Sequence, residues 1–162
     1  MQGCNSLRAF WRNSKNKILP LEVFPQGVFA YIYSYGTIMK NHLLLVGIGG
    51  FIGGIARYLT AHWLTRLFPS TFPYGTFTVN IIGCLFIGIV YGLSERFNWL
   101  TSEWRLFLAT GICGGYTTFS SFIYEDVNLV QTSNYLTFAT YSISSFLLGL
   151  LAVFTGLTLA KI

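Results

Sequence analysis

The sequence predicts an all-α membrane protein with four transmembrane helices, and two observations carry this fold class. Of the 162 residues, 53% are hydrophobic and only 9% are charged, whereas a soluble domain carries roughly 25% charged residues. The apolar residues also gather in four segments, 43–64, 76–94, 105–125 and 135–160. Each is near the roughly 20 residues that a helix needs to cross a bilayer. We therefore expect a multi-pass membrane protein.

Three short connectors separate these segments, at 66–75, 95–104 and 125–134. They contain most of the turn residues and charges of this part of the chain, which is typical of loops at a membrane surface. None is long enough to hold a soluble domain. The transmembrane domain is therefore expected to occupy residues 39–162.

Residues 1–38 are expected to form an N-terminal extension. Their apolar portion, 28–35, is too short to span a bilayer and precedes no evident signal-peptide cleavage site. Because Met39 directly precedes the first strong span, the extension is either disordered or lies before the natural start. Most of the net charge of +5 comes from the first 40 residues, which indicates contact with a membrane surface or the cytoplasm and not with nucleic acid.

Beyond Met39 few basic residues flank the spans, and their bias towards one side of the membrane is slight. The connectivity places Arg66 on one side, and on the other side Lys40, Arg96, Arg105 and Lys161. Since lysine and arginine near the spans favour the cytoplasmic side, so slight a bias makes insertion in both orientations conceivable.

A polar, glycine-rich motif interrupts the third apolar segment. Residues 114–122 read GGYTTFSSF. An unpaired backbone group is costly in hydrocarbon, so a break in a transmembrane helix survives only where protein or water surrounds it. The freed carbonyls and hydroxyls then become ligands. The motif therefore indicates an ion pathway at a helix broken in mid-membrane, with a simple glycine kink as the alternative.

Several side chains within the spans offer hydrogen-bond donors or positive potential that could bind an anion. The Asn80 amide offers hydrogen-bond donors, although an interhelical hydrogen bond is the alternative. Phe119 and Phe122 share a helical face, where their ring edges carry positive potential, but such a pair is ordinarily core. Tyr141 and Ser145 place two hydroxyls on one face of the fourth segment.

Two charges within or beside the spans require explanation because ionisable groups there are costly and often functional. Arg57 either attracts an anion in a vestibule or extends to the lipid headgroups. Glu125 either acts at a pore end or gate, or caps the membrane interface. Glycines at four-residue spacing, Gly49 with Gly53, Gly50 with Gly54 and Gly88 with Gly92, predict close helix packing.

Three ordered motifs resemble those of the Fluc/CrcB family of small bacterial fluoride channels. They are residues 49–58 (GGFIGGIARY), 75–83 (GTFTVNIIG) and 114–122 followed by Glu125. The resemblance implies a fluoride-selective channel in a bacterial inner (plasma) membrane that passively exports cytoplasmic fluoride and so gives fluoride resistance. It also implies an antiparallel, dual-topology homodimer with a structural Na⁺ at its centre, and fluoride, the lipid bilayer and a second copy of the chain as partners.

The resemblance also implies roles for individual residues. The backbone carbonyls of Gly114 and Thr117 would ligate Na⁺, while Arg57 and Glu125 would serve a vestibule or gate. The residues implied to line the fluoride pore are Asn80, Phe119, Phe122, Ser120, Thr118, Tyr141 and Ser145.

Two other function classes stay open. A small coupled transporter of the multidrug-exporter kind would need a carboxylate within the membrane, yet the first span has none and Glu125 lies at a span end. An accessory membrane protein would use its glycines and polar residues only for packing. An enzyme is not expected, because no nucleophile with an adjacent base, metal cluster or phosphate-binding loop is evident.

Overall fold

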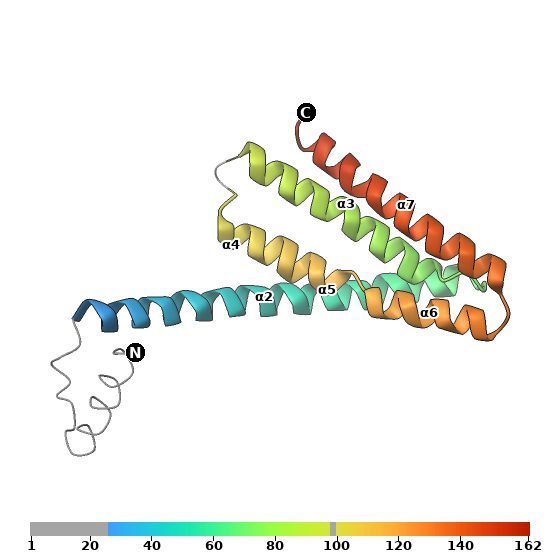
Figure 1. Ribbon diagram of the computed structural model, residues 1–162, viewed down its shortest axis with the longest axis horizontal. Coiled ribbons are helices and arrows are strands. Elements are labelled where there is room, and N and C mark those ends of the chain that lie inside the picture. Colours follow the sequence, from blue (N-terminus) through green and yellow to red (C-terminus); the bar gives the residue numbers. More distant parts are fainter. Residues whose placement is uncertain (1–25, 98–99) are drawn as a thin grey trace, which may run out of the picture. The chain divides into compact units, whose positions relative to one another are not determined.

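The computed structural model describes the backbone of residues 26–97 and 100–162, and side chains from Met39 onward. All regular elements in these ranges are helices, and Figure 1 shows their order. They are α2 (Gln26–Leu67), α3 (Tyr74–Arg96), α4 (Ser102–Arg105), η2 (Leu106–Cys113), α5 (Gly114–Tyr116), α6 (Phe119–Gln131) and α7 (Tyr135–Leu159). The chain divides into two compact units, Met1–Met39 and Lys40–Ile162, and the description below concerns the second.

Four segments of the described chain are long and apolar enough to cross a membrane, Met39–Leu67, Tyr74–Arg96, Ser102–Gln131 and Tyr135–Leu159. The prediction of four membrane-length helices is thus confirmed, with ends that differ by a few residues from those expected. The prediction of an N-terminal extension lies largely outside the described residues, and only the helical backbone from Gln26 falls within them.

Helices α3 and α7 lie side by side and run in the same direction (Figure 1). Their close approach depends on glycine. A Cβ atom at Gly88 would collide with the carbonyl of Val153 and lie 3.1 Å from the Cα of Gly156, and one at Gly92 would lie 2.6 Å from the Cβ of Ala160. The packing predicted for the Gly88 and Gly92 pair is therefore observed, and α7 supplies the surface that fits it.

Helix α2 packs against the first part of the third span. A Cβ at Gly49 would lie 2.8 Å from the Cα of Gly111, and one at Gly53 would collide with the carbonyl of Ile112. In contrast, a Cβ at Gly54 would meet nothing within 4 Å. Of the two overlapping glycine pairs, Gly49 with Gly53 therefore faces the third span of the same chain.

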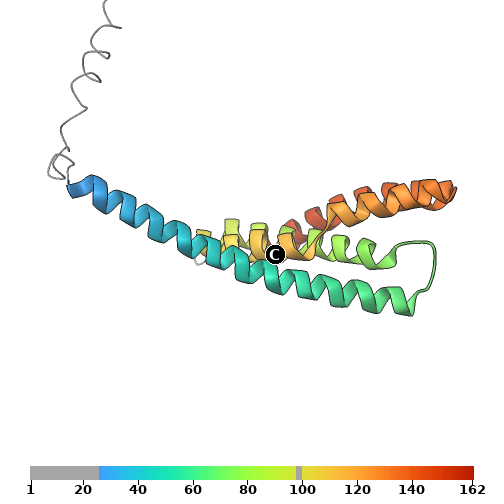
Figure 2. The same cartoon turned by 90° about the horizontal axis from the view of Figure 1, so that it is seen from below.

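The third span is assembled from four successive elements. After the single turn α4, the π-helix η2 runs over Leu106–Cys113 and leads into α5. Such widened turns often occur at functional sites. The chain is then non-helical at Thr117 and Thr118 before α6 begins, and α6 lies beside the first half of α7 (Figure 2).

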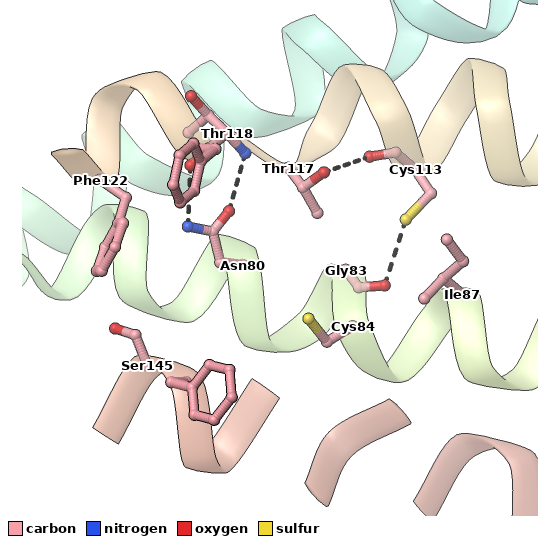
Figure 3. A pocket seen from close by; sticks show the side chains of 11 residues that line it. Asn80, Gly83, Cys84, Ile87, Cys113, Thr117, Thr118, Phe122 and Ser145 are labelled. Carbon is pink, nitrogen blue, oxygen red and sulfur yellow. Dashed lines mark hydrogen bonds between the residues drawn. The ribbon is translucent and has the colours of Figure 1, made fainter. Parts of the chain in front are cut away.

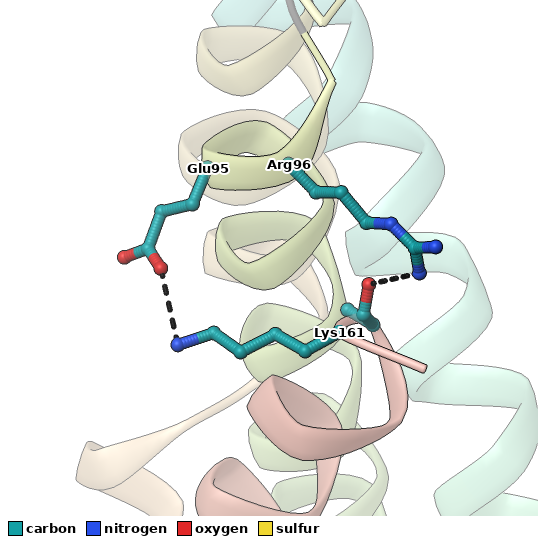
Figure 4. A network of polar contacts seen from close by, with 4 residues as sticks. Glu95, Arg96 and Lys161 are labelled. Atoms are coloured by element: carbon teal, nitrogen blue, oxygen red, sulfur yellow. Dashed lines mark hydrogen bonds and ion pairs between the residues drawn. The ribbon is translucent and has the colours of Figure 1, made fainter.

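Helices α3 and α7 end at the same end of the bundle (Figure 4). Most of the basic residues beyond Met39 lie towards this end. There Lys161 forms an ion pair of 3.4 Å with Glu95, and Arg96 donates to the carbonyl of Ala160 at 3.5 Å. Both side chains of the ion pair are exposed, so the pair is expected to stabilise the helix ends only weakly.

Candidate ion-binding site

The break in the third span lies at the threonines and not at the glycines. Gly114 and Gly115 remain helical within α5, whereas Thr117 (φ −81°, ψ 156°) and Thr118 (φ −148°, ψ 118°) are extended. The sequence correctly predicted an interruption in this motif. The alternative, a simple kink at the glycines, is not observed. No glycine in the described chain has a positive φ angle, and the helix continues through Gly114 and Gly115.

Asn80 bridges the break with two hydrogen bonds (Figure 3). The backbone N–H of Thr118 donates to Asn80 Oδ1 at 2.8 Å, and Asn80 Nδ2 donates to the carbonyl of Thr118 at 3.1 Å. These two bonds fix which end of the amide faces which backbone group. The interhelical hydrogen bond left open for Asn80 is therefore present, and one of its two amide hydrogens is left for another acceptor.

Thr118 also caps α6. Its Oγ1 accepts a hydrogen bond from the backbone N–H of Ser121 at 3.2 Å and lies 3.3 Å from Ser120 Oγ. In a continuous helix the N–H groups of Thr118 and Ser121 would donate to the carbonyls of Gly114 and Thr117. Because they donate to Asn80 and Thr118 Oγ1 instead, these two carbonyls lose their helical donors.

A pocket of about 360 Å³ adjoins the break. Its lining is mostly apolar, with a few polar groups that converge on it, which is typical of ligand sites. The lining residues are Asn80, Gly83, Cys84, Ile87, Cys113, Thr117, Thr118, Phe119, Phe122, Ser145 and Phe146. Five predicted pore residues, Asn80, Thr118, Phe119, Phe122 and Ser145, are thus brought together from three different spans.

Ser145 is the clearest free donor at this pocket. Its Oγ is buried and has no hydrogen-bond partner within the described chain, and Figure 3 shows the side chain on α7 opposite Asn80. A buried hydroxyl without a partner is costly, so each such group in a native structure calls for a ligand or a water. Ser145 therefore marks a position where the pocket can receive a hydrogen-bond acceptor.

The two phenylalanines that follow the break lie close to each other. The ring centroids of Phe119 and Phe122 are 5.9 Å apart, with 35° between the ring planes. They differ in surroundings: Phe119 is 75% exposed in the single chain, whereas Phe122 packs on the ring of Tyr141 at 5.0 Å. Phe119 is thus not a core side chain of this chain.

Tyr141 is fully buried, and its hydroxyl is already engaged. It donates to Glu125 Oε2 at 2.7 Å, while Thr76 Oγ1 donates to Glu125 Oε1 at 2.6 Å. Each carboxylate oxygen of Glu125 therefore has its own donor, one from α3 and one from α7. Glu125 thus joins three spans near one end of the bundle.

The sequence reasoning missed several members of this polar group. Thr76, Asp126 and Ser142 were not predicted to belong to it. In the structure Asp126 is only 7% exposed, and both of its carboxylate oxygens lie 3.0 Å from Ser142 Oγ. The sequence feature that could have pointed to them is Asp126, a second acidic residue directly after Glu125 at the end of an apolar span. The consecutive residues Glu125 and Asp126 thus contact the consecutive residues Tyr141 and Ser142.

The remaining predicted residues lie elsewhere or contribute indirectly. Arg57 lies in α2, partly exposed, and does not line the pocket. Ser120 contacts the pocket-lining Thr118 without lining the pocket itself.

Cys84 and Cys113 both line the pocket, and Cys113 Sγ donates to the carbonyl of Gly83 at 3.3 Å. Among the described residues no cluster of three or more His, Cys, Asp or Glu side chains forms a metal site.

Four apolar spans, a third span broken at Thr117 and Thr118, and a pocket with converging donors define a multi-pass membrane protein with an intramembrane polar site. Comparison with known proteins identifies the family. Residues 44–157 match the model of the CrcB-like protein family, Camphor Resistance (CrcB), and the chain belongs to this family. The resemblance inferred from the three sequence motifs is thereby confirmed.

Curated relatives match most of this chain and nearly all of their own length. A relative from Azobacteroides pseudotrichonymphae is 43% identical over 123 residues, which cover 76% of this chain and 98% of that protein. One from Flavobacterium psychrophilum is 43% identical over 119 residues, covering 74% and 96%. One from Bacteroides fragilis is 49% identical over 119 residues, covering 72% and 93%. All three are described as fluoride-specific ion channels.

Proposed function

We propose that this protein is a fluoride-selective ion channel that passively exports fluoride and so protects its cell from this ion. The observation that carries the proposal is the pocket at the break in the third span, where Asn80 and the unpartnered Ser145 hydroxyl face a mostly apolar cavity. The relatives described as fluoride-specific channels support the same reading. Their descriptions concern ion conduction and not an enzymatic reaction.

The chemistry of the pocket suits a small, strongly hydrated anion. A dry site must replace the water of such an ion with hydrogen-bond donors, since an unpaired buried charge is costly. Asn80 retains one amide hydrogen and Ser145 its hydroxyl hydrogen, and the ring edges of Phe119 and Phe122 add positive potential. Among the described residues no lysine or arginine lines the pocket, so no positive side chain from this part of the chain would trap the anion there.

Passive export follows from the membrane potential. Fluoride that enters as the neutral acid dissociates in a near-neutral cytoplasm, and a negative-inside potential then drives the anion outward with about 2.3 kcal/mol per 100 mV. The protein needs to supply only a selective path through the inner membrane. Glu125, with donors from Thr76 and Tyr141, is proposed to lie at one end of this path. Arg57 is proposed to attract the anion from the adjoining vestibule.

We further propose that two chains in antiparallel, dual-topology arrangement form the working channel. Phe119 is 75% exposed in the single chain, and Gly114 is exposed as well. A second copy would cover these groups and complete the site around the pocket. The basic residues that flank the spans beyond Met39 are few, and their slight bias is compatible with insertion in both orientations.

A structural sodium ion at the centre of this dimer is also proposed, and the residues of this chain fit it. The carbonyls of Gly114 and Thr117 have lost their helical donors, which go to Asn80 and to Thr118 Oγ1. Unwound transmembrane backbone of this kind is a recurring source of Na⁺ ligands. When bound, the ion would be coordinated by these carbonyl oxygens in place of the lost hydrogen bonds. The test is thermal unfolding of the purified protein in sodium and in potassium salts, with a higher melting temperature expected in sodium.

Fluoride efflux from liposomes tests the proposed function. The full chain is reconstituted with internal potassium fluoride or potassium chloride, and valinomycin is added to release the charge. Valinomycin-dependent loss of fluoride without loss of chloride is expected. A rate that follows an imposed proton gradient instead would favour a coupled transporter, and absence of flux from folded protein would favour an accessory role.

A further inference from the structure

We propose that Phe72, in the connection between α2 and α3, is a positioning residue for the fluoride path and acts through Tyr141. This inference rests on the proposed function and adds to it a residue outside the membrane spans. Phe72 does not line the pocket. Its ring instead contacts the ring of Tyr141, with centroids 5.4 Å apart and the planes at 78°.

Local structure fixes Phe72 in this place. Ser70 Oγ donates to the carbonyl of Phe72 at 3.1 Å and accepts from its N–H at 3.2 Å. The same carbonyl accepts from the N–H of Tyr74 at 2.9 Å, where α3 begins. Phe72 is partly buried, whereas Phe68 and the next three residues of the connection are exposed. The connection therefore directs one aromatic side chain towards the helices.

Three phenylalanines from three segments surround the Tyr141 ring. Phe72 comes from the connection, Phe77 from α3 at 6.4 Å, and Phe122 from α6 at 5.0 Å. Phe72 also packs edge-on against Phe77 at 5.3 Å. Tyr141 has 0% exposure, so its ring has no freedom to move without displacing one of the three. The hydroxyl is thereby held towards Glu125, to which it donates at 2.7 Å.

The row of rings links the connection to the predicted pore. Phe119 contacts Phe122, Phe122 contacts Tyr141, and Tyr141 contacts Phe72. Of these, Phe72 is the one residue that comes from a connection between spans. Loss of the Phe72 ring would leave a void beside Tyr141, and the hydroxyl would no longer be held against Glu125. The carboxylate of Glu125, which accepts this hydrogen bond, would then be less well ordered at that end of the proposed path.

The test compares full-length Phe72→Leu protein with Phe68→Leu as the matched control. Phe68 lies in the same connection, is 54% exposed, and contacts the ring of Tyr74 but not that of Tyr141. Fluoride efflux is measured from liposomes that contain equal amounts of folded protein. Phe72→Leu is expected to slow efflux by about 2- to 10-fold, which is the rate change that corresponds to the loss of one aromatic pair. Phe68→Leu is expected to leave the rate unchanged. Phe72→Tyr, which keeps the ring, is expected to restore the rate.

A double variant separates positioning from general support of the fold. If Phe72 acts through the Tyr141 hydroxyl, Phe72→Leu combined with Tyr141→Phe conducts at the rate of Tyr141→Phe alone. The inference is overturned if Phe72→Leu conducts like the wild type, if Phe68→Leu loses as much, or if the two losses multiply. Phe72→Met replaces Phe72→Leu if the latter does not fold, and failure of both to fold also overturns it. Wild-type protein without fluoride flux contradicts the proposed function itself, before any variant is compared.

Discussion

Asn80 and the backbone of Thr118 form a pair of hydrogen bonds of 2.8 and 3.1 Å across the break in the third span. The pair satisfies an N–H and a carbonyl that the interrupted helix cannot satisfy. Asn80 also lines the pocket, and one of its two amide hydrogens takes no part in this pair. A single residue on α3 thus stabilises the break and belongs to the proposed ion path.

Asn80→Ala is expected to damage both stability and conduction. The substitution leaves the N–H and the carbonyl of Thr118 without their partner, at about 1–3 kcal/mol for each buried group. We expect a lower melting temperature and a fluoride efflux rate reduced by roughly tenfold or more. Asn128→Ala, at an exposed position on α6, is the control and should leave both quantities unchanged. Wild-type efflux from the Asn80→Ala protein would remove Asn80 from the path.

Tyr141→Phe is expected to slow fluoride efflux while the fold is retained. It removes the hydroxyl that donates to Glu125 Oε2 and leaves that oxygen with no donor from α7. Loss of a hydrogen bond to a charged group costs about 1.5–3 kcal/mol. Efflux is measured beside Tyr135→Phe, which alters an exposed tyrosine of the same helix. Equal rates for the two variants would contradict a role for the Glu125 end of the path.

Thr118→Val is expected to destabilise the start of α6. Valine has nearly the shape of threonine but cannot accept the hydrogen bond from Ser121 N–H, and loss of such a cap costs about 1 kcal/mol. Thr118→Ser keeps the hydroxyl and serves as the matched control. Thermal unfolding of the purified proteins is the measurement. A valine variant as stable as the serine variant would show that the cap is dispensable.

Gly53→Ala is expected to prevent normal folding or to lower stability strongly. A Cβ at this position would collide with the carbonyl of Ile112 and lie 2.8 Å from the backbone nitrogen of Tyr116. Backbone atoms have little room to shift in a packed core, and overpacking costs about 1–3 kcal/mol. Gly47→Ala lies in the same helix, where a Cβ meets nothing within 4 Å. The yield and melting temperature of the two variants are compared, and equal values would contradict the close packing of α2.

Lys161→Ala is expected to change little. The ion pair with Glu95 is 3.4 Å long, but the side chains are 60% and 64% exposed. Exposed pairs contribute about 0–1 kcal/mol because water and salt screen them. We expect a shift in melting temperature close to the error of the measurement, and a smaller shift at high salt. A large loss of stability would show that the pair at the ends of α3 and α7 is structurally important.

The sequence is enough to locate the four spans, because about 20 consecutive apolar residues are stable only in the hydrocarbon of a bilayer. It also located the interruption between Gly114 and Phe122, since polar residues within an apolar span stand out against their neighbours. Asn80 and Ser145 could be selected for the same reason, whereas Phe122 was selected because it matches the motif of the family. The family could be recognised because its motifs are continuous in sequence.

The pairing of these groups, in contrast, depends on how the spans pack against one another. That Asn80 bonds to Thr118, that Glu125 receives donors from both Thr76 and Tyr141, and that Phe72 reaches Tyr141 all depend on contacts between segments distant in the chain. Hydropathy and periodicity report what one segment prefers, not which residue of another span will face it. The exact break at Thr117 and Thr118 follows from those cross-span hydrogen bonds, which compensate for the lost helical ones. Local glycine content could not reveal it, because the compensating partners lie on another helix.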